Sequence, residues 1–82
     1  MEQEILNALR PAFPDVYGDV TLEESTDCYN GYVLSKGFEE LTFAERQRHV
    51  FDILRESFGS KAQRIAFIFT YTPYEYELLQ AA

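Results

Sequence analysis

The feature that most constrains the fold is an amphipathic segment, residues 41–59. Its apolar side chains recur at spacings of three, four and seven residues, which predicts a helix of about four turns with one buried stripe. Thr42 and Glu45 fit a capping box at its start, and Gly59 follows the last periodic residue, where a left-handed stop costs least. The stripe consists of Phe43, Val50, Phe51, Leu54 and Phe58.

An uninterrupted apolar run follows at residues 65–69, inside the segment 63–72. Such a run is typical of a central strand that is covered on both faces. Residues 32–35 predict another strand ahead of the long helix. Because that helix has the length of a crossover connection, we expect the two strands to lie parallel, with a right-handed connection.

Both ends of the chain predict helices. Residues 2–13 place apolar side chains at helical spacing, but Pro11 lacks the backbone N–H of an interior position, so the helix should end close to it. Near the other end, Thr72 and Glu75 fit a second capping box, which predicts a short helix over residues 73–80.

A hairpin is expected between the first two helices. Residues 16–24 alternate in the manner of a strand with one buried face. The polar segment 25–31 ends in Asn30-Gly31, a strong short-range turn signal. We therefore expect an antiparallel pair of strands with Cys28 at or near its tip.

Together these elements predict an α+β fold in the order helix-strand-strand-helix-strand-helix. A three-stranded mixed sheet with helices packed on one side accounts for all the apolar stripes. The chain of 82 residues, 46% of them apolar, has room for one core, so residues 1–82 should form a single domain.

Charge disfavours nucleic acid as a partner. Fourteen acidic residues against seven basic ones give a net charge of −7, and a nucleic-acid backbone repels such a surface unless the basic residues cluster. Acidic residues are interspersed among the basic ones at pairing distance, and the glycine-rich GxxG loop of KH domains is missing. Five basic residues lie between positions 46 and 64: Arg46, Arg48, Arg55, Lys61 and Arg64.

Cysteine and histidine usage excludes further classes. One cysteine and one histidine cannot make an internal disulfide or a closed Cys/His zinc site. The longest apolar run is far shorter than the ~20 residues that span a bilayer, and the acidic start lacks the features of a signal peptide. We therefore expect a cytosolic protein without a membrane segment.

Several short motifs, in this order and spacing, resemble the BolA-like proteins, whose fold is KH-like. The resemblance covers roughly residues 2–80. It rests on Val33-Leu34-Ser35, Phe38-Glu39, Glu45-Arg46-Gln47-Arg48 and Thr72-Pro73-Tyr74-Glu75-Tyr76.

The resemblance implies a non-enzymatic adaptor that pairs with a monothiol glutaredoxin, often around a shared [2Fe-2S] cluster. The family's cluster ligands are a Cys or His between the first two strands and a His at the start of the third. Cys28 matches the first position, either as a ligand or as an unremarkable loop cysteine beside Asp27. Arg64 stands at the second position, and Tyr76 replaces a family tryptophan. A guanidinium offers only donors and cannot bind iron.

Two polar residues of the long helix also depart from a simple pattern. His49 lies with Glu45 and Asp52 opposite the apolar stripe, which predicts a solvated face with ion pairs. Gln47 lies on the stripe, where the family carries histidine, and a buried amide must be hydrogen-bonded.

Our leading hypothesis is a non-enzymatic BolA-like interaction module that binds a monothiol glutaredoxin in iron–sulfur or redox homeostasis, with Cys28 as a metal-ligand candidate. The alternatives are a KH-like nucleic-acid-binding regulator and a structural or homo-oligomeric domain that has lost the cluster site. No catalytic constellation is visible. The partner or nucleic-acid surface is expected to include Arg46, Arg48, Lys61, Arg64, Tyr74 and Tyr76.

Overall fold

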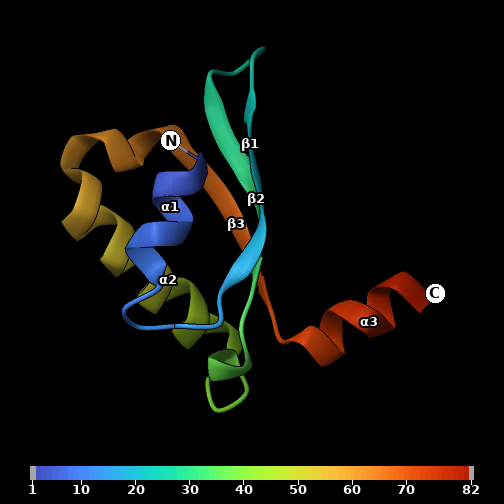
Figure 1. The fold of residues 1–82 in the computed structure, drawn as a ribbon. Coiled ribbons are helices and arrows are strands. Elements are labelled where there is room, and N and C mark those ends of the chain that lie inside the picture. Colours follow the sequence, from blue (N-terminus) through green and yellow to red (C-terminus); the bar gives the residue numbers. More distant parts are fainter. Residues whose placement is uncertain (1, 82) are drawn as a thin grey trace.

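The elements follow one another in the predicted order, as a computed structural model describes for residues 2–81 (Figure 1). The helices are α1 (Glu2–Leu9), α2 (Phe43–Phe58) and α3 (Pro73–Ala81). The strands are β1 (Tyr17–Glu23), β2 (Cys28–Leu34) and β3 (Ile65–Tyr71). Two 3₁₀ helices, η1 (Lys36–Phe38) and η2 (Gly59–Arg64), flank α2. The α+β class is confirmed.

The three strands form a mixed sheet in the order β1-β2-β3. β1 and β2 are antiparallel, with Tyr17 opposite Leu34. β2 and β3 are parallel, as the crossover length of α2 predicted. The prediction that β3 is the central strand is wrong, because β2 occupies the centre and β3 an edge. An apolar run does not distinguish a doubly covered strand from an edge strand whose outer side chains stay exposed.

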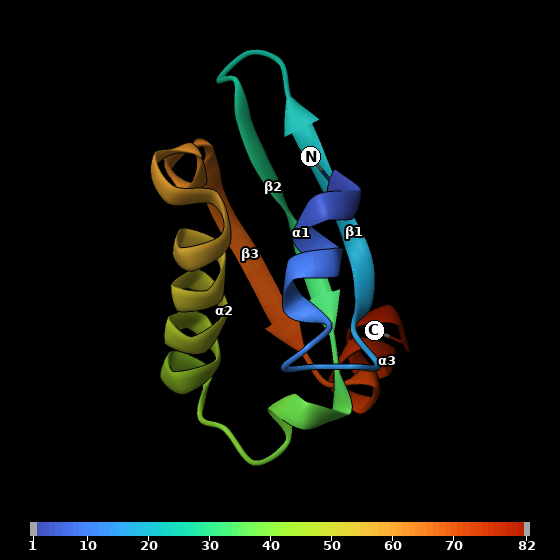
Figure 2. The same ribbon diagram turned by 60° about the vertical axis from the view of Figure 1, so that its left-hand side comes forward.

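α1 and α2 cover one face of the sheet (Figures 1 and 2). α3 differs from the expectation of helices on one side only: it lies on the other side of the sheet, near the end of β3, and points outward. The core lies between the sheet and the first two helices. Its fully buried members include Ile5, Leu9, Val33, Phe38, Val50, Leu54 and Ile68.

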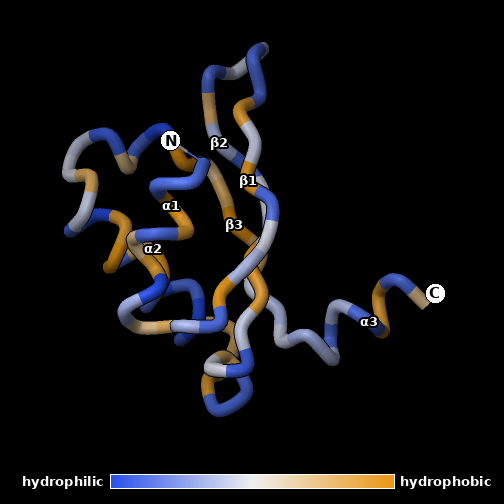
Figure 3. The backbone as a smooth tube through the Cα atoms, viewed as in Figure 1, coloured by the Kyte–Doolittle hydropathy of each residue, from blue (hydrophilic) through white to orange (hydrophobic). Residues whose placement is uncertain are grey.

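The hydropathy of the backbone follows this layering (Figure 3). The hairpin that links β1 to β2 is hydrophilic at its tip, where Glu23, Glu24 and Asp27 lie. Among the helices of residues 2–81, none combines the length and the apolar character needed to cross a bilayer.

β2 begins four residues earlier than predicted, at Cys28 instead of residue 32, because the hairpin turn comes before Asn30-Gly31. Asn30 and Gly31 are inside β2, and the turn falls at residues 24–27, where Asp27 adopts a positive φ of 56°. Gly31 is needed for a different reason: a Cβ there would lie 2.1 Å from the backbone oxygen of Asp19. Glycine permits this close approach of β1 to β2. Cys28 is the first residue of β2, just beyond the tip.

The helix boundaries match their local signals. Thr42 and Glu45 form the capping box of α2, and Gly59 ends that helix at φ 59°. The same arrangement opens α3, where the amide of Glu75 donates to Thr72 Oγ1 at 3.1 Å and the amide of Thr72 donates to Glu75 Oε1 at 2.8 Å. One member of the predicted stripe is not in the core, since Phe43 at the start of α2 is 57% exposed.

Candidate functional site

The hairpin turn and Arg64 meet at one end of the sheet. Arg64, the last residue of η2, donates from Nη2 to Asp27 Oδ1 at 2.7 Å and from Nε to the backbone oxygen of Asp27 at 3.4 Å. The guanidinium carbon lies 5.7 Å from the centroid of the Tyr29 ring. The hairpin turn and the start of β3 are therefore joined by an ion pair that is backed by an aromatic ring. We call Asp27, Tyr29 and Arg64 the hairpin clasp.

Cys28 is beside the clasp but does not belong to it. Its thiol is half-buried and donates to the backbone oxygen of Thr26 at 3.4 Å. Successive side chains of a strand point to opposite faces, so Cys28 and Tyr29 face different sides of the sheet. Because Arg64 packs on Tyr29, the thiol and the guanidinium are on different sides too.

These residues do not fit the two-ligand contribution to a [2Fe-2S] cluster that the family implies. Cluster iron is held by thiolates or by imidazoles with a free lone pair, and Cys28 is the one such group at this end of the sheet. The single histidine, His49, is on α2 and makes an edge contact with Phe13, with ring centroids 5.1 Å apart. Within residues 2–81 no three His, Cys, Asp or Glu side chains are grouped to hold a metal.

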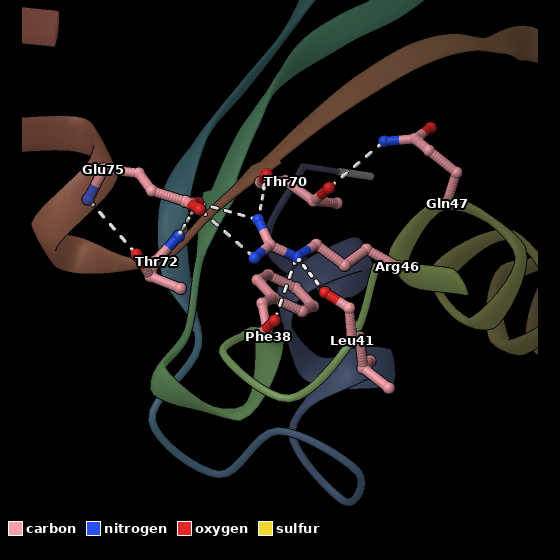
Figure 4. A network of polar contacts seen from close by, with 7 residues as sticks. All are labelled: Phe38, Leu41, Arg46, Gln47, Thr70, Thr72 and Glu75. Carbon is pink, nitrogen blue, oxygen red and sulfur yellow. Dashed lines mark hydrogen bonds and ion pairs between the residues drawn. The ribbon is translucent and has the colours of Figure 1, made fainter. Parts of the chain in front are cut away.

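Arg46 is placed differently from its prediction as a surface residue. It is 7% exposed and is surrounded by acceptors from four segments (Figure 4). Nε donates to the backbone oxygens of Phe38 at 2.9 Å and Leu41 at 3.2 Å, and Nη1 donates to that of Thr70 at 3.3 Å. Two further bonds reach Glu75, from Nη1 to Oε1 at 2.7 Å and from Nη2 to Oε2 at 3.2 Å. The guanidinium thus stabilises the fold and is not part of an exposed basic surface.

The pKa of Glu75 reflects this position. The hydrogen bonds from Arg46 hold the pKa of the carboxyl below its ordinary value, and the amide of Thr72 acts in the same direction. Burial acts against both and does not overcome them. Glu75 therefore has two structural functions, as the capping residue of α3 and as the counter-ion of Arg46.

The side-chain amide of Gln47 is hydrogen-bonded, as its place on the apolar stripe of the helix requires. Its Nε2 donates to the backbone oxygen of Ile68 at 2.9 Å and to Thr70 Oγ1 at 3.3 Å. Arg46 donates to the oxygen of Thr70 (Figure 4), so α2 covers two consecutive outward-facing carbonyls of β3, those of Ile68 and Thr70.

The remaining basic residues do not gather into one surface. Arg48 and Lys61 are exposed, on α2 and η2 respectively. Arg55 forms an ion pair with Asp52 one turn earlier on α2. His49 is exposed on α2, as its place opposite the stripe predicted.

An apolar hollow of about 390 Å³ lies between the start of α2 and α3, and no prediction from the sequence included it. Arg46 and Glu75 line it together with apolar side chains. The sequence signal that could have revealed it is the apolar pair Leu78 and Leu79 in a helix that buries none of its residues. These apolar lining residues are Phe43, Tyr71, Leu78 and Leu79.

Comparison with known proteins identifies the architecture. No protein-family model matches the sequence, and no curated protein matches it. Among solved structures, BolA1 from Arabidopsis thaliana superposes with a TM-score of 0.70 at 22% sequence identity. The match covers 90% of this chain and 93% of that one. The chain has a BolA-like fold.

The BolA-like fold separates two groups that the sequence had placed on one surface. The hairpin clasp lies where β3 begins, whereas Tyr74 and Tyr76 follow the end of β3. A strand of seven residues holds its ends roughly 20 Å apart. Tyr74 is 67% exposed, and Tyr76 stacks on Tyr32 at a centroid distance of 4.9 Å. Arg64 and the C-terminal tyrosines therefore form two separate surfaces.

Proposed function

We propose that the chain is a non-enzymatic interaction module with a BolA-like fold, which binds a monothiol glutaredoxin in the cytosol without contributing ligands to a shared cluster. The observation that carries this proposal is the ion pair between Asp27 and Arg64, because it engages the residue that stands at the second of the two ligand positions implied by the resemblance. A cytosolic location is supported by a chain whose single cysteine forms no disulfide within the domain.

The clasp provides a surface that a partner can reach. Arg64 is 47% exposed and Asp27 74% exposed, so each retains contact with solvent beside the ion pair. A carboxylate of the partner can add charge-assisted hydrogen bonds to the guanidinium. Tyr29 limits the conformations of Arg64, and a side chain that is already ordered loses less entropy when a partner binds.

The alternative of a nucleic-acid-binding regulator has weaker support. Of the five clustered basic residues, Arg46 is buried and Arg55 is paired with Asp52. Arg64 forms an ion pair with Asp27, which neutralises its charge. Two exposed cations, Arg48 and Lys61, are a small electrostatic footprint for a chain of net charge −7.

Titration calorimetry with a metal-free monothiol glutaredoxin tests the interaction. We expect saturable binding that Arg64→Met weakens about tenfold, because a charge-assisted contact is lost. Lys36→Met is the matched control, since it removes one exposed charge from η1, at the opposite end of the sheet. Absence of binding, or equal weakening by both variants, would contradict the proposed interface.

A second measurement tests the claim that no cluster is shared. The protein is added anaerobically to a glutaredoxin loaded with its [2Fe-2S] cluster, and the visible absorption and circular dichroism spectra are recorded. We expect unchanged spectra. A change typical of histidine ligation by the unmodified protein would contradict the proposal that the chain contributes no ligand.

A further inference from the structure

The face of the sheet turned away from α1 and α2 carries a continuous row of aromatic rings. Phe67 and Phe69 of β3 meet edge to face at a centroid distance of 5.2 Å, and Phe69 stacks with Tyr71 at 6.0 Å. Tyr71 lies 6.2 Å from Tyr76 of α3, and Tyr76 stacks on Tyr32 of β2. We call these five residues the aromatic row.

Strand alternation accounts for the row. Ile68 and Thr70 are buried beneath the helices, so their neighbours Phe67 and Phe69 point to the opposite face. That face is open apart from α3 at one end (Figures 1 and 2). Phe67 and Phe69 are 47% and 46% exposed, far more than side chains of this size in a core. Tyr17 on β1, 52% exposed, extends the aromatic surface.

The charged side chains of the strands and of α3 are all acidic. β1, β2, β3 and α3 contain neither lysine nor arginine. Asp19 is the cross-strand partner of Tyr32, and Glu23 that of Cys28, and strand alternation places both carboxylates on the face of the aromatic row. The basic residues lie instead just after α1, in α2 or in the two 3₁₀ helices: Arg10, Lys36, Arg46, Arg48, Arg55, Lys61 and Arg64.

We propose that the aromatic row, with Asp19 and Glu23 beside it, is a docking surface for a basic segment of a partner protein. Arginine or lysine side chains of that segment lie over the rings, which attract cations through their negative faces. Asp19 and Glu23 pair with the same cations. Arginine fits best, because its planar guanidinium both stacks on rings and bonds to carboxylates. This surface is distinct from the hairpin clasp and does not depend on the glutaredoxin interaction.

Charge also decides against two other occupants of an aromatic face. A second copy of the chain would bring further carboxylates onto Asp19 and Glu23, and two chains of net charge −7 repel each other. Single-stranded nucleic acid stacks on aromatic residues too, but it needs a positively charged groove for its phosphates. The strands and α3, which form the described part of the open face, contain no lysine or arginine for that purpose.

The test uses a fluorescein-labelled peptide of alternating arginine and glycine, titrated by fluorescence anisotropy at low and at physiological salt. We expect saturable binding that weakens as salt rises. Replacing both rings by Phe67→Leu and Phe69→Leu keeps apolar area but removes the π faces, and should weaken binding about fivefold or more. Phe67→Tyr with Phe69→Tyr should bind as the unmodified protein does. Far-UV circular dichroism verifies that each variant is folded.

A charge-matched pair of variants isolates the carboxylates. Asp19→Asn with Glu23→Gln should weaken binding about fivefold. Glu40→Gln with Glu56→Gln removes the same charge from exposed positions outside the open face and should leave the affinity within about twofold. Equal weakening by both pairs would mean that only net charge matters.

Three further outcomes would overturn the proposal. They are equal affinity for a citrulline peptide of the same sequence, tight binding of oligouridylate in place of the arginine peptide, and a dimer in sedimentation that the leucine variants dissociate.

Discussion

Arg46 and Glu75 are 29 residues apart in the chain and form a two-bond ion pair, Nη1 to Oε1 at 2.7 Å and Nη2 to Oε2 at 3.2 Å. The pair joins α2 to the first turn of α3. The same guanidinium bonds to the backbone oxygens of Phe38 and Leu41, which lie in η1 and in the loop ahead of α2. One side chain therefore fixes the position of three segments relative to β3.

Arg46→Met should be among the most destabilising single substitutions in the chain. It keeps an apolar stem but removes the side-chain donor to the backbone oxygen of Thr70 and one of the two donors to that of Phe38, and it removes the partner of Glu75. We expect a loss of about 3 kcal/mol in the free energy of unfolding, measured in urea. Arg48→Met, at an exposed position two residues on, should change it by no more than about 0.5 kcal/mol. Equal effects would contradict the network.

Stability should fall as the solution becomes acidic. The pKa of Glu75 is lowered in the folded state, chiefly by Arg46, and that of Asp15 is lowered chiefly by Ser35. A carboxyl with a lowered folded-state pKa stabilises the protein above its unfolded-state pKa, near 4 to 4.5. The contribution is lost as pH falls further, through the folded-state value. Thermal melts from pH 7 to pH 3 should show this decline.

Glu75→Gln separates this contribution from general acid denaturation. The amide retains an acceptor for the capping box but cannot titrate, so the variant should be less stable at pH 7 and should lose less on acidification. A pH profile parallel to that of the unmodified protein would assign the decline to other carboxyls.

The loss in the free energy of unfolding caused by truncating a core side chain should increase with the burial of that side chain. Leu54 and Ile68 are fully buried, so changing either to alanine should cost about 2–5 kcal/mol in denaturant unfolding. Phe51 packs against the core but is only half-buried, so Phe51→Ala should cost less than a typical buried phenylalanine. Losses under about 1 kcal/mol at both buried positions would refute the core assignment.

Gly31→Ala tests the close approach of β1 and β2. The added Cβ would collide with the backbone oxygen of Asp19, and relieving the clash should cost about 1–3 kcal/mol. Thr21→Ala on the adjacent strand is an exposed control. A neutral result at Gly31 would indicate that the strands separate more easily than the sheet geometry implies.

Nucleic-acid binding should be absent at physiological salt. The net charge of −7 and the burial of Arg46 both act against it. Fluorescence anisotropy with labelled single-stranded and duplex DNA at two salt concentrations measures this. Sequence-selective binding below micromolar concentration would contradict the prediction.

The predictions that rest on local sequence signals were the most accurate. The capping boxes at Thr42 and Thr72 and the stop at Gly59 depend on neighbouring residues only, and all three are present. The parallel pairing of β2 and β3 followed from the length of α2, which is a property of chain connectivity.

Properties that depend on distant neighbours could not be predicted in the same way. Nothing near Phe67 in the sequence shows that its side of β3 stays uncovered. The charge of Arg46 suggested a surface residue, and its burial depends on Glu75, a residue of another helix. Asn30-Gly31 has the composition of a turn, but Gly31 is needed inside β2, because the backbone of β1 approaches it too closely for a Cβ atom.

The site was anticipated only in part. The resemblance paired the hairpin loop with the start of β3, and Arg64 does contact Asp27 in that loop. Arg64 precedes β3 and Tyr76 follows it, so the length and direction of β3 separate them. The short motifs of the resemblance carry no information on that distance.

The hydrogen bonds from α2 to β3 also affect the tendency of the protein to aggregate at high concentration. An edge strand with apolar side chains is a template onto which another polypeptide can add and begin a fibril. On β3 the outward carbonyls of Ile68 and Thr70 are already taken by Gln47 and Arg46. A sheet with an exposed aromatic face is thereby protected from growing by strand addition along that edge, and Gln47→Leu should make the protein more prone to aggregate than its loss of stability alone explains.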